Sequence, residues 1–394
     1  MRFSISFSIL LAALGAFGCT ADGASKSLEG GPLSGRARGD AKTDVLPATP
    51  TGAEQQGKAD GNDPRDQYPG SYGFTNPPSV KSAVAGEFEP INTFFIGWGS
   101  GAWENEQFFA EIIRASADEV TVTIVVPDQQ SANALDSDLA GFGVNMANVQ
   151  MVLYGVDTIW MRDYGPLAAA SSSGALTLVD PRYYWGRWMD DYFPTALANA
   201  DGLPASRPPI EMEGGNFQSD GQGRCVATDA HVERNYAFGY TAADIKNLFA
   251  AYYGCQQTTL VPALSGEGTG HVDMSVHVTG PGEVIVGQYT TADDSVNAKR
   301  LDQAAQMLAN DGFLVRRVPM PKNDRRSVFR SYTNALAVNG KVLVPVYDED
   351  QRYEQEALAV FKEAYPNRQL VPIASDAIIQ WAGAIHCVTM TYNQ

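Results

Sequence analysis

The alternation of short apolar strands with helical stretches, from Glu87 onward, constrains the fold of this 394-residue chain more than any other feature. Strands that are separated by helices favour an α/β fold. The predicted unit of two strands, a helix and another strand recurs at intervals of roughly fifty to seventy residues, a spacing typical of radial or propeller-like arrays. Strands are expected at 91–99, 120–127, 148–156, 271–278, 283–290, 313–320 and 369–374, hairpins at Ser173-Gly174 and Asn339-Gly340, and helices at 105–118, 242–254, 294–312 and 350–366.

The first residues of the chain indicate export. One basic residue is followed by an apolar run too short to span a membrane and then by small residues, which is typical of a secretory signal peptide, here 1–18. Cys19 follows directly, as in bacterial lipoproteins, so we predict that Cys19 carries a lipid anchor. Ordinary secretion with an incidental Cys19 is the alternative. We therefore expect an exported protein, either an outer-membrane lipoprotein or a secreted one.

Residues 19–83 are rich in Gly, Ala, Asp, Ser and Pro and have few large apolar side chains. Such a segment cannot offset the conformational entropy that folding removes, so we expect a flexible tether there and a catalytic domain at 84–394. The formal net charge of −17 argues against nucleic acid and anionic lipid as partners, and it is compatible with a cationic substrate. Membrane contact is then expected only through the lipid anchor.

Cysteine usage narrows the chemistry further. Beyond Cys19 the cysteines lie far apart and form no CxxC pair, so we expect no metal site. In an oxidising compartment two of the remaining three tend to pair, and Cys225 and Cys255 are close in sequence and adjoin strand-like runs. A Cys225–Cys255 disulfide leaves Cys387 as an odd thiol, which could be apolar filler, a metal ligand or a nucleophile.

Four short strings place polar residues at strand ends or tight turns, where functional sites tend to be built. They are WMRDYGP (160–166), MEGGNF (212–217), GTGHVDM (268–274) and AIHC (384–387). In the second string, Asn216 is a candidate for binding substrate or backbone groups.

Each string also has a structural explanation. If His271 and Asp273 lie on a strand, they point to the same side and can act as a base and its electrostatic partner, although an HxD pattern also occurs by chance. Asp163 can be a site carboxylate or a turn residue paired with Arg162. Glu213 can belong to the site or cap a turn.

The combination of these residues leaves few reaction classes. A free cysteine and a histidine, without a metal quartet or a phosphate loop, imply nucleophilic attack at an electrophilic carbon. Carboxylates in the same site match a planar guanidinium, which they bind in bidentate geometry. A protease would more usually orient its histidine with Asn or a single Asp.

The sequence resembles the bacterial peptidyl-arginine deiminase and agmatine deiminase family on five strings in this order: WMRDYGP, EGGNF, GHVD, SYTNALAVNGKVLVPVYD and GAIHC. The closer match is to the Porphyromonas-type peptidyl-arginine deiminases. The resemblance covers about Val84 to Gln394 and includes the opening AGEFEPINTFFIGWG. It implies a pentein, which is a five-bladed α/β propeller of ββαβ units with its site in a central channel, and it implies no cofactor.

The resemblance also implies a hydrolase that acts on the C–N bonds of linear amidines. Asp163 and Asp273 hold the nitrogens of the guanidinium, and Cys387, as a thiolate, attacks its central carbon. His271 protonates the departing ammonia and then activates water to hydrolyse a covalent thiouronium intermediate, which leaves a ureido group. A thiolate near a protonated histidine and a cationic substrate is expected to have a lowered pKa.

Further site residues follow from the same resemblance. Asn334 matches an active-site asparagine, with a turn residue as the alternative. Trp160 is expected to wall the guanidinium pocket, with core packing as the alternative, and Glu213 to support the catalytic histidine. His386 points away from Cys387 if the segment is extended, so we leave it out of the catalytic set.

The sequence departs from the family where the substrate is chosen. Secreted relatives hold the carboxylate of a C-terminal arginine with two arginines. Here Arg187 matches one of them and Trp185 stands at the place of the other, which could favour a peptide, a longer alkyl guanidine or agmatine. His277 stands where relatives usually have Arg or Lys.

The expected partners are therefore arginine-containing peptides or proteins, with peptidyl-citrulline as the product, or small guanidines such as agmatine. One alternative is an agmatine deiminase-like hydrolase, although such enzymes work in the cytoplasm. An amidinotransferase that uses the same cysteine and a non-catalytic guanidine-binding lipoprotein are the others. The last alternative predicts loss of the nucleophile or the histidine, whereas Cys387 and His271 are both present.

Overall fold

The computed structural model describes residues 26–27, 73–183, 186–322 and 328–392. The predicted signal peptide 1–18, Cys19 and Trp185 lie outside these ranges.

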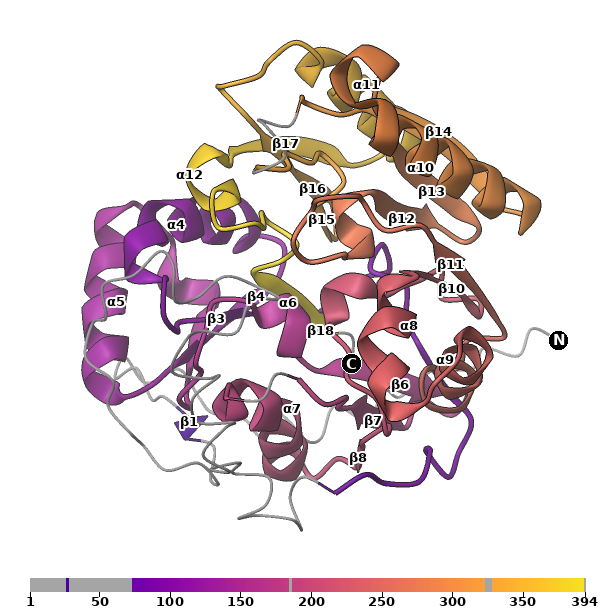
Figure 1. Ribbon diagram of the computed structural model, residues 1–394. Coiled ribbons are helices and arrows are strands. Elements are labelled where there is room, and N and C mark those ends of the chain that lie inside the picture. The colour runs from indigo at the N-terminus through magenta and orange to yellow at the C-terminus, as the bar shows by residue number, and fades with distance from the viewer. Residues whose placement is uncertain (1–25, 28–72, 184–185, 323–327, 393–394) are drawn as a thin grey trace, which may run out of the picture.

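The described strands form five sheets that follow one another around the molecule (Figure 1). In each sheet an antiparallel pair is followed by a helical crossover to a strand that is parallel to the second, which is the predicted ββαβ unit. The sheets consist of β2 (Ser82–Val84), β6 (Leu167–Ser171), β7 (Leu176–Val179) and β8 (Ala205–Ser206); of β9 (Gln218–Ser219), β10 (Arg224–Thr228) and β11 (Gln257–Val261); of β12 (Val276–Gly280), β13 (Glu283–Gln288) and β14 (Leu314–Pro319); of β15 (Leu336–Val338), β16 (Lys341–Val346) and β17 (Gln369–Ala374); and of β18 (Thr389–Tyr392), β3 (Thr93–Gly97), β4 (Thr121–Val126), β5 (Val149–Leu153) and β1 (Lys26–Ser27).

The longer helices lie toward the outside of the view in Figure 1, whereas β18 and the short α6 lie near its middle. Amphipathic patterning explains this placement: in α4, Phe109, Ile112 and Ile113 are buried while Arg114 is exposed. Within the described residues no helix has both the length and the apolar character to cross a membrane. The helices are α4 (Glu106–Ser116), α5 (Gln129–Gly141), α6 (Met161–Tyr164), α7 (Trp188–Asp201), α8 (Ala230–Asn235), α9 (Ala242–Leu248), α10 (Thr291–Asn310), α11 (Glu354–Ala364) and α12 (Asp376–Ile379).

The sheet of β3, β4 and β5 takes its antiparallel strand, β18, from the far end of the sequence. β18 pairs with β3, with Thr389 opposite Ile96 and Tyr392 opposite Thr93. The loop that precedes β18 is therefore held next to the sheet that contains β3.

Most of the predicted elements are confirmed. β6 and β7 form the predicted hairpin with Gly174 at a φ of 81°, and β15 and β16 form the hairpin at Asn339-Gly340. The helix predicted to start at Asp294 begins earlier, because Thr290 caps α10. Asp294 interrupts the helical geometry, and its side chain accepts a hydrogen bond from the backbone of Asn297, so it caps the longer part of the helix.

The strand predicted over 271–278 is wrong in its first half. His271 precedes the 3₁₀ turn η6 (Val272–Met274), and the strand begins only at Val276. Side chains take the backbone donors that a strand would have used: Thr269 Oγ1 accepts from the backbone of His271 at 3.1 Å, and Asn216 Oδ1 accepts from that of Val272 at 3.1 Å.

Described residues before the expected boundary at residue 84 also pair with the domain. β2 pairs with β6, and the backbone of Thr75 donates to that of Arg207 at 3.0 Å. Lys26–Ser27 in the expected tether also pair with β5. Residues on both sides of the gap at 28–72 thus contact the folded units.

The predicted disulfide is present. Cys225 on β10 is joined to Cys255, which lies just before β11, the parallel neighbour of β10. Among the described cysteines, Cys387 is free and buried.

Candidate active site

The free cysteine lies in a buried turn rather than in an extended segment. Residues 385–388 turn between α12 and β18, and Cys387 is 2% exposed. Asn334 Nδ2 lies 3.0 Å from Cys387 Sγ, and Asn334 Oδ1 accepts from the backbones of Ala384 at 3.1 Å and Cys387 at 3.3 Å. Asn334 thus both donates to the sulfur and fixes the turn that carries it, as expected of an active-site asparagine.

Trp160 adjoins this turn through a glycine. A Cβ on Gly383 would lie 2.6 Å from the Trp160 ring and 2.8 Å from Cys387 Cβ, so glycine allows the indole and the turn that carries Cys387 to approach each other. Trp160 is fully buried. Its contact with the turn of Cys387 leaves both predicted roles open, a wall of the guanidinium pocket and core packing.

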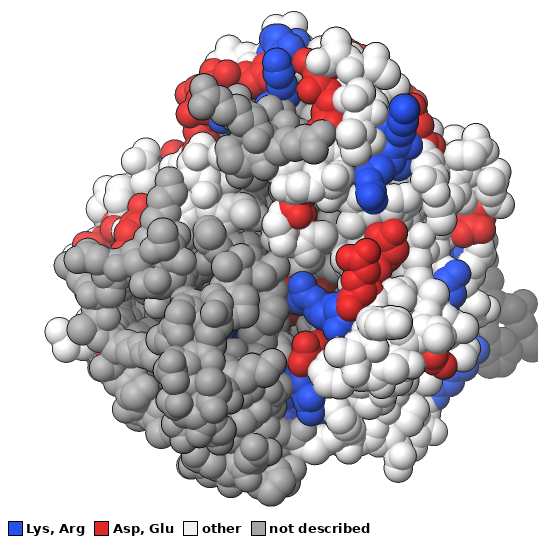
Figure 2. Space-filling view, in the orientation of Figure 1, with Lys and Arg blue, Asp and Glu red and all other residues white. Residues whose placement is uncertain are grey.

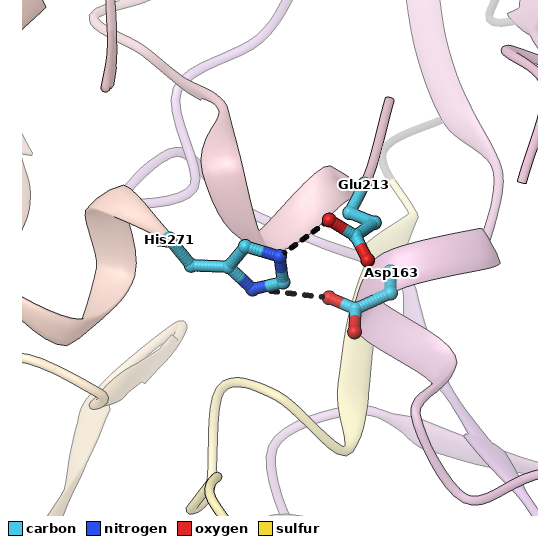
Figure 3. Close-up of side chains that lie close together, drawn as sticks. All are labelled: Asp163, Glu213 and His271. Carbon is cyan, nitrogen blue, oxygen red and sulfur yellow. Dashed lines mark hydrogen bonds and ion pairs between the residues drawn. The ribbon is translucent and has the colours of Figure 1, made fainter. Parts of the chain in front are cut away.

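His271 lies between two carboxylates (Figure 3). Its Nε2 is 2.9 Å from Glu213 Oε2, and its Nδ1 is 3.5 Å from Asp163 Oδ1. Glu213 precedes the 3₁₀ turn η3 (Gly214–Asn216) and also pairs with Arg234 of α8. Two turns and two helices therefore converge on one imidazole, and Glu213 supports it as predicted.

The carboxylates keep this imidazole charged. Burial alone would lower the pKa of His271, but Asp163 and Glu213 outweigh burial and raise its pKa to about 10. Burial raises the pKa of Asp163 to about 7 against the opposing effect of His271. Burial would also raise the pKa of Glu213, but Arg234 and His271 bring it down to about 2. The histidine is therefore a proton donor at neutral pH.

The same three side chains are spaced closely enough to hold a metal ion, with ligand atoms within 4.8 Å of one another. A metal-binding imidazole must release a proton from the coordinating nitrogen. In the protein without an ion, the carboxylates raise the pKa of His271 to about 10, so a metal ion would have to displace a proton from this imidazole.

Several buried polar atoms of the site have no hydrogen-bond partner within the described residues. They are both carboxylate oxygens of Asp163, Oδ1 of Asp273 and Nδ1 of His271. Buried carboxylate oxygens are rarely left without a donor, because desolvation without a hydrogen bond costs about 1–3 kcal/mol or more. This cluster can accept several N–H donors from one planar cation.

The thiol differs from the expectation. Burial, then the carboxylates of Asp273 and Asp163, raise the pKa of Cys387 well above its ordinary value, against hydrogen bonds from Asn334 and the Ala384 backbone. The predicted lowering of the thiol pKa is for a site that also holds a cationic substrate, and the protein alone shows the opposite direction. The nearest charges are carboxylates, and His271 is occupied by its own two partners.

His386, which an extended segment would point away from the site, instead contacts the site carboxylate Asp273. His386 Nδ1 is 2.7 Å from Asp273 Oδ2, and its Nε2 is 2.7 Å from Glu87 Oε2. The prediction that His386 points away assumed extended backbone, whereas residues 385–388 form a turn. Glu87 was also missed, although it lies in the AGEFEP string that opens the domain.

The structure modifies the interpretations of Asn216 and Arg162. Asn216 does not offer its side chain to a substrate, because both ends of its amide already have partners. Its Nδ2 donates to Thr228 Oγ1 at 2.9 Å, and its Oδ1 accepts from the backbone of Thr228 at 2.9 Å and from the backbone of Val272. Arg162 pairs with Glu87 instead of with Asp163, which leaves the neighbouring carboxylate to the site.

Arg187, at the start of α7, is fully buried and donates to Tyr183 Oη at 3.3 Å. His277 bonds Tyr365 Oη at 2.9 Å. On the face drawn in Figure 2, acidic and basic side chains lie next to one another near the middle of the view.

Five ββαβ units with a cysteine, a histidine and carboxylates gathered from the loops of different units define a protein of the guanidine-modifying pentein superfamily. The sequence model of the Porphyromonas-type peptidyl-arginine deiminase family matches residues 83–392, and the chain belongs to this family.

Individual relatives agree with this assignment. The agmatine deiminase of Ectopseudomonas mendocina is 24% identical over 336 residues, which are 74% of this chain and 88% of that protein. The structure of the agmatine deiminase of Enterococcus faecalis superposes with a TM-score of 0.70 at 20% identity, covering 80% of this chain and 96% of the other. The agmatine deiminase of C. jejuni gives a TM-score of 0.68 at 17% identity over 79% and 96% of the two chains. These two structures support the pentein fold.

Proposed function

We propose that this protein hydrolyses a guanidinium group to a ureido group and ammonia through a covalent intermediate on Cys387. The observation that supports this most is the cluster of buried carboxylate oxygens without donors, on Asp163 and Asp273, beside a free thiol and a protonated imidazole. A guanidinium offers five N–H donors in one plane and a single electrophilic carbon.

Charge balance explains how a thiol with a raised pKa can react. Each carboxylate around the site already forms an ion pair with a cationic side chain. The pairs are Asp163–His271, Asp273–His386, Glu213–Arg234 and Glu87–Arg162. A bound guanidinium adds a positive charge next to Cys387. Loss of the thiol proton compensates for that charge, so the substrate itself favours the thiolate.

The reaction then proceeds in two halves. The Cys387 thiolate attacks the guanidinium carbon, and His271 donates its proton to one amino nitrogen, which leaves as ammonia with its bonding pair. The carbon stays bonded to sulfur as a thiouronium. His271, now neutral, takes a proton from water as the oxygen attacks that carbon. The C–S bond then breaks and the thiolate leaves with its electron pair, while the second proton of the water passes from the oxygen to solvent as the ureido carbonyl forms.

The substrate we propose first is peptidyl-arginine, converted to peptidyl-citrulline, which rests on the family to which the chain belongs. A small guanidine is the second candidate, since the relatives described above are agmatine deiminases. The complete burial of Arg187 favours the second candidate over a C-terminal arginine, because a substrate carboxylate would have to displace the contacts that cover it.

The test measures ureido formation and ammonia release by the full chain on free arginine, a peptide ending in arginine, a peptide with internal arginine, and agmatine. Cys387→Ala is the control for each substrate. Turnover of peptides supports the first candidate, and turnover of agmatine alone supports the second. Binding of guanidines with no turnover of any of them would instead identify a guanidine-binding protein.

We also propose that the protein is exported and anchored through Cys19. Metabolic labelling with a radioactive fatty acid tests this, because a Cys19→Ala variant should lose the label while a Cys387→Ala variant should keep it.

A further inference from the structure

The start of the domain and the nucleophile turn are joined by a buried chain of charged side chains. Asp273 Oδ2 is bonded by His386 Nδ1, whose Nε2 reaches Glu87, and Glu87 is bonded in turn by Arg162. Arg162 Nε also donates to the carbonyl of His386 at 3.2 Å. His386 is fully buried, and only Glu87 reaches solvent, with 18% of its side chain exposed.

The hydrogen bonds define the protonation of this chain. A carboxylate can only accept hydrogen bonds, so an imidazole bonded to carboxylates through both nitrogens donates from both and is an imidazolium. Burial and the Arg162 guanidinium would lower the pKa of His386, but Glu87 and Asp273 overcome them and raise it. Burial would raise the pKa of Glu87, but Arg162 and His386 lower it to about 2.

His277 of β12 also faces this chain of side chains. It is neutral, since burial, with a contribution from His386, lowers its pKa to about 3. Its Nε2 bonds Tyr365 instead of a carboxylate.

The two oxygens of Asp273 are used differently. Oδ2 faces His386 and lies 3.5 Å from Cys387 Sγ, whereas Oδ1 is buried without a partner in the described structure. A carboxylate held by one oxygen in a short charged hydrogen bond cannot rotate freely, so its other oxygen keeps one direction.

We propose that His386 and Glu87 are positioning residues: they hold Asp273 by Oδ2 so that Oδ1 faces the guanidinium, and they offset the negative charge that Asp273 places beside Cys387. This inference rests on the proposed function for its substrate but not for its effect on the thiol. His386 does not contact the reacting atoms itself, and it acts through Asp273.

The test compares His386→Ala, His386→Asn and Glu87→Gln in the full chain. Asparagine can restore a neutral donor to Asp273 without reaching Glu87, and glutamine at 87 keeps the size but removes the charge. His277→Gln is the matched control, because it replaces a buried histidine that carries no charge. The first readout is kcat/KM on the guanidine that the wild type turns over, together with the affinity of that guanidine in a Cys387→Ala background.

We expect kcat/KM to fall about 10- to 100-fold in His386→Ala, the range typical when a group that orients an active-site ligand is removed. His386→Asn should recover part of the loss, Glu87→Gln should lie between Asn and wild type, and His277→Gln should lose less activity than His386→Ala, because it removes a neutral imidazole that does not bond Asp273. Equal activity in all variants would overturn the proposal, and so would a His386→Asn variant that is no better than His386→Ala although both fold.

The second readout needs no turnover. The pH dependence of Cys387 alkylation by iodoacetamide, with the labelled peptide identified by mass spectrometry, should move to higher pH in the His386 variants, because Asp273 then acts on the thiol without its counter-charge. If no guanidine is turned over but this shift is seen, the proposed function fails and the positioning role stands. An unchanged profile in folded variants overturns the positioning role.

Discussion

At the scale of single residues, the site depends on which atoms are left without partners. Asp163 and Asp273 lie among cations, yet three of their four oxygens accept no hydrogen bond from the described residues. His271 lies between Asp163 and Glu213, and His386 lies between Asp273 and Glu87. Because their carboxylate partners differ, we propose different roles for the two histidines, His271 as the proton donor to the leaving group and His386 as a positioning residue behind Asp273.

Asn334 offers the sharpest test at this scale. Asn334→Asp keeps the oxygen that accepts from the Ala384 and Cys387 backbones but replaces the donor to Sγ by a negative charge. A hydrogen bond to a charged group contributes about 1.5–3 kcal/mol, so we expect kcat at neutral pH to fall roughly 10- to 100-fold. The thiol pKa should rise further, so the loss should shrink as pH increases. A loss that is equal at every pH would contradict this account.

At the scale of elements, the turn that carries Glu213 is as important as the carboxylate. A Cβ on Gly215 would lie 2.5 Å from His271 Nδ1 and 2.8 Å from Asp163 Oδ1. Only a glycine lets this turn approach the pair so closely.

Gly215→Ala should therefore separate His271 from Asp163 and weaken guanidine binding by more than about tenfold, with a loss of about 1–3 kcal/mol in the free energy of unfolding from overpacking. Gly268→Ala is the matched control, since its Cβ would meet no atom within 4 Å. Calorimetric affinity in a Cys387→Ala background and urea denaturation measure the two effects. Equal affinities in the two glycine variants would show that the turn tolerates a side chain.

The elements also show what sequence can predict. Strand periodicity and turn residues predict a recurring α/β unit, because β6–β7 and β15–β16 obey local rules, whereas the number of five units comes from the family resemblance. The cysteine, His271 and the two aspartates follow from their motifs. His386 and Glu87 do not, because whether residues 385–388 turn or extend is decided by Asn334, some fifty residues away in sequence. Asn216 lies in a motif among candidate site residues, so the sequence alone makes it look like one of them. Only its contacts with Thr228 and Val272 show that it holds two loops together.

At the scale of the whole molecule, the disulfide should contribute to stability and not to catalysis. Cys225 and Cys255 are separated by 30 residues and lie on β10 and beside β11, away from the thiol of Cys387. Closing a loop of this length is worth about 3–4 kcal/mol in the chain-entropy account. We expect Cys225→Ser/Cys255→Ser to lose about that much in urea denaturation and to keep kcat/KM. A large loss of activity in the folded variant would contradict this separation.

Buried neutral histidines should make the protein sensitive to mild acid. The pKa of His277 is lowered by burial from 6.5 to about 3 in the folded chain, so the unfolded chain takes up the proton first as pH falls. The stability that goes with neutral His277 is complete above pH 6.5 and decreases toward pH 3. Between pH 6.5 and 4.5 this decrease is about 2–3 kcal/mol.

His277→Gln should therefore unfold with a shallower dependence on pH over this window, even if its stability at pH 8 is lower by the bond to Tyr365. Urea denaturation at several pH values measures the slope. Parallel slopes for variant and wild type would show that His277 is protonated in the folded state or exposed to solvent.

The pairing of β18 with β3 has a consequence for the order of folding. Thr389 of β18 pairs with Ile96 of β3, although nearly the whole length of the domain separates them in sequence. The turn that carries Cys387 lies immediately before β18. Contacts between such distant segments form slowly, because loop closure costs entropy before any contact is gained. During refolding from denaturant, helical signal should thus return before catalytic competence, and the time between them measures how long the chain persists as a compact but inert intermediate.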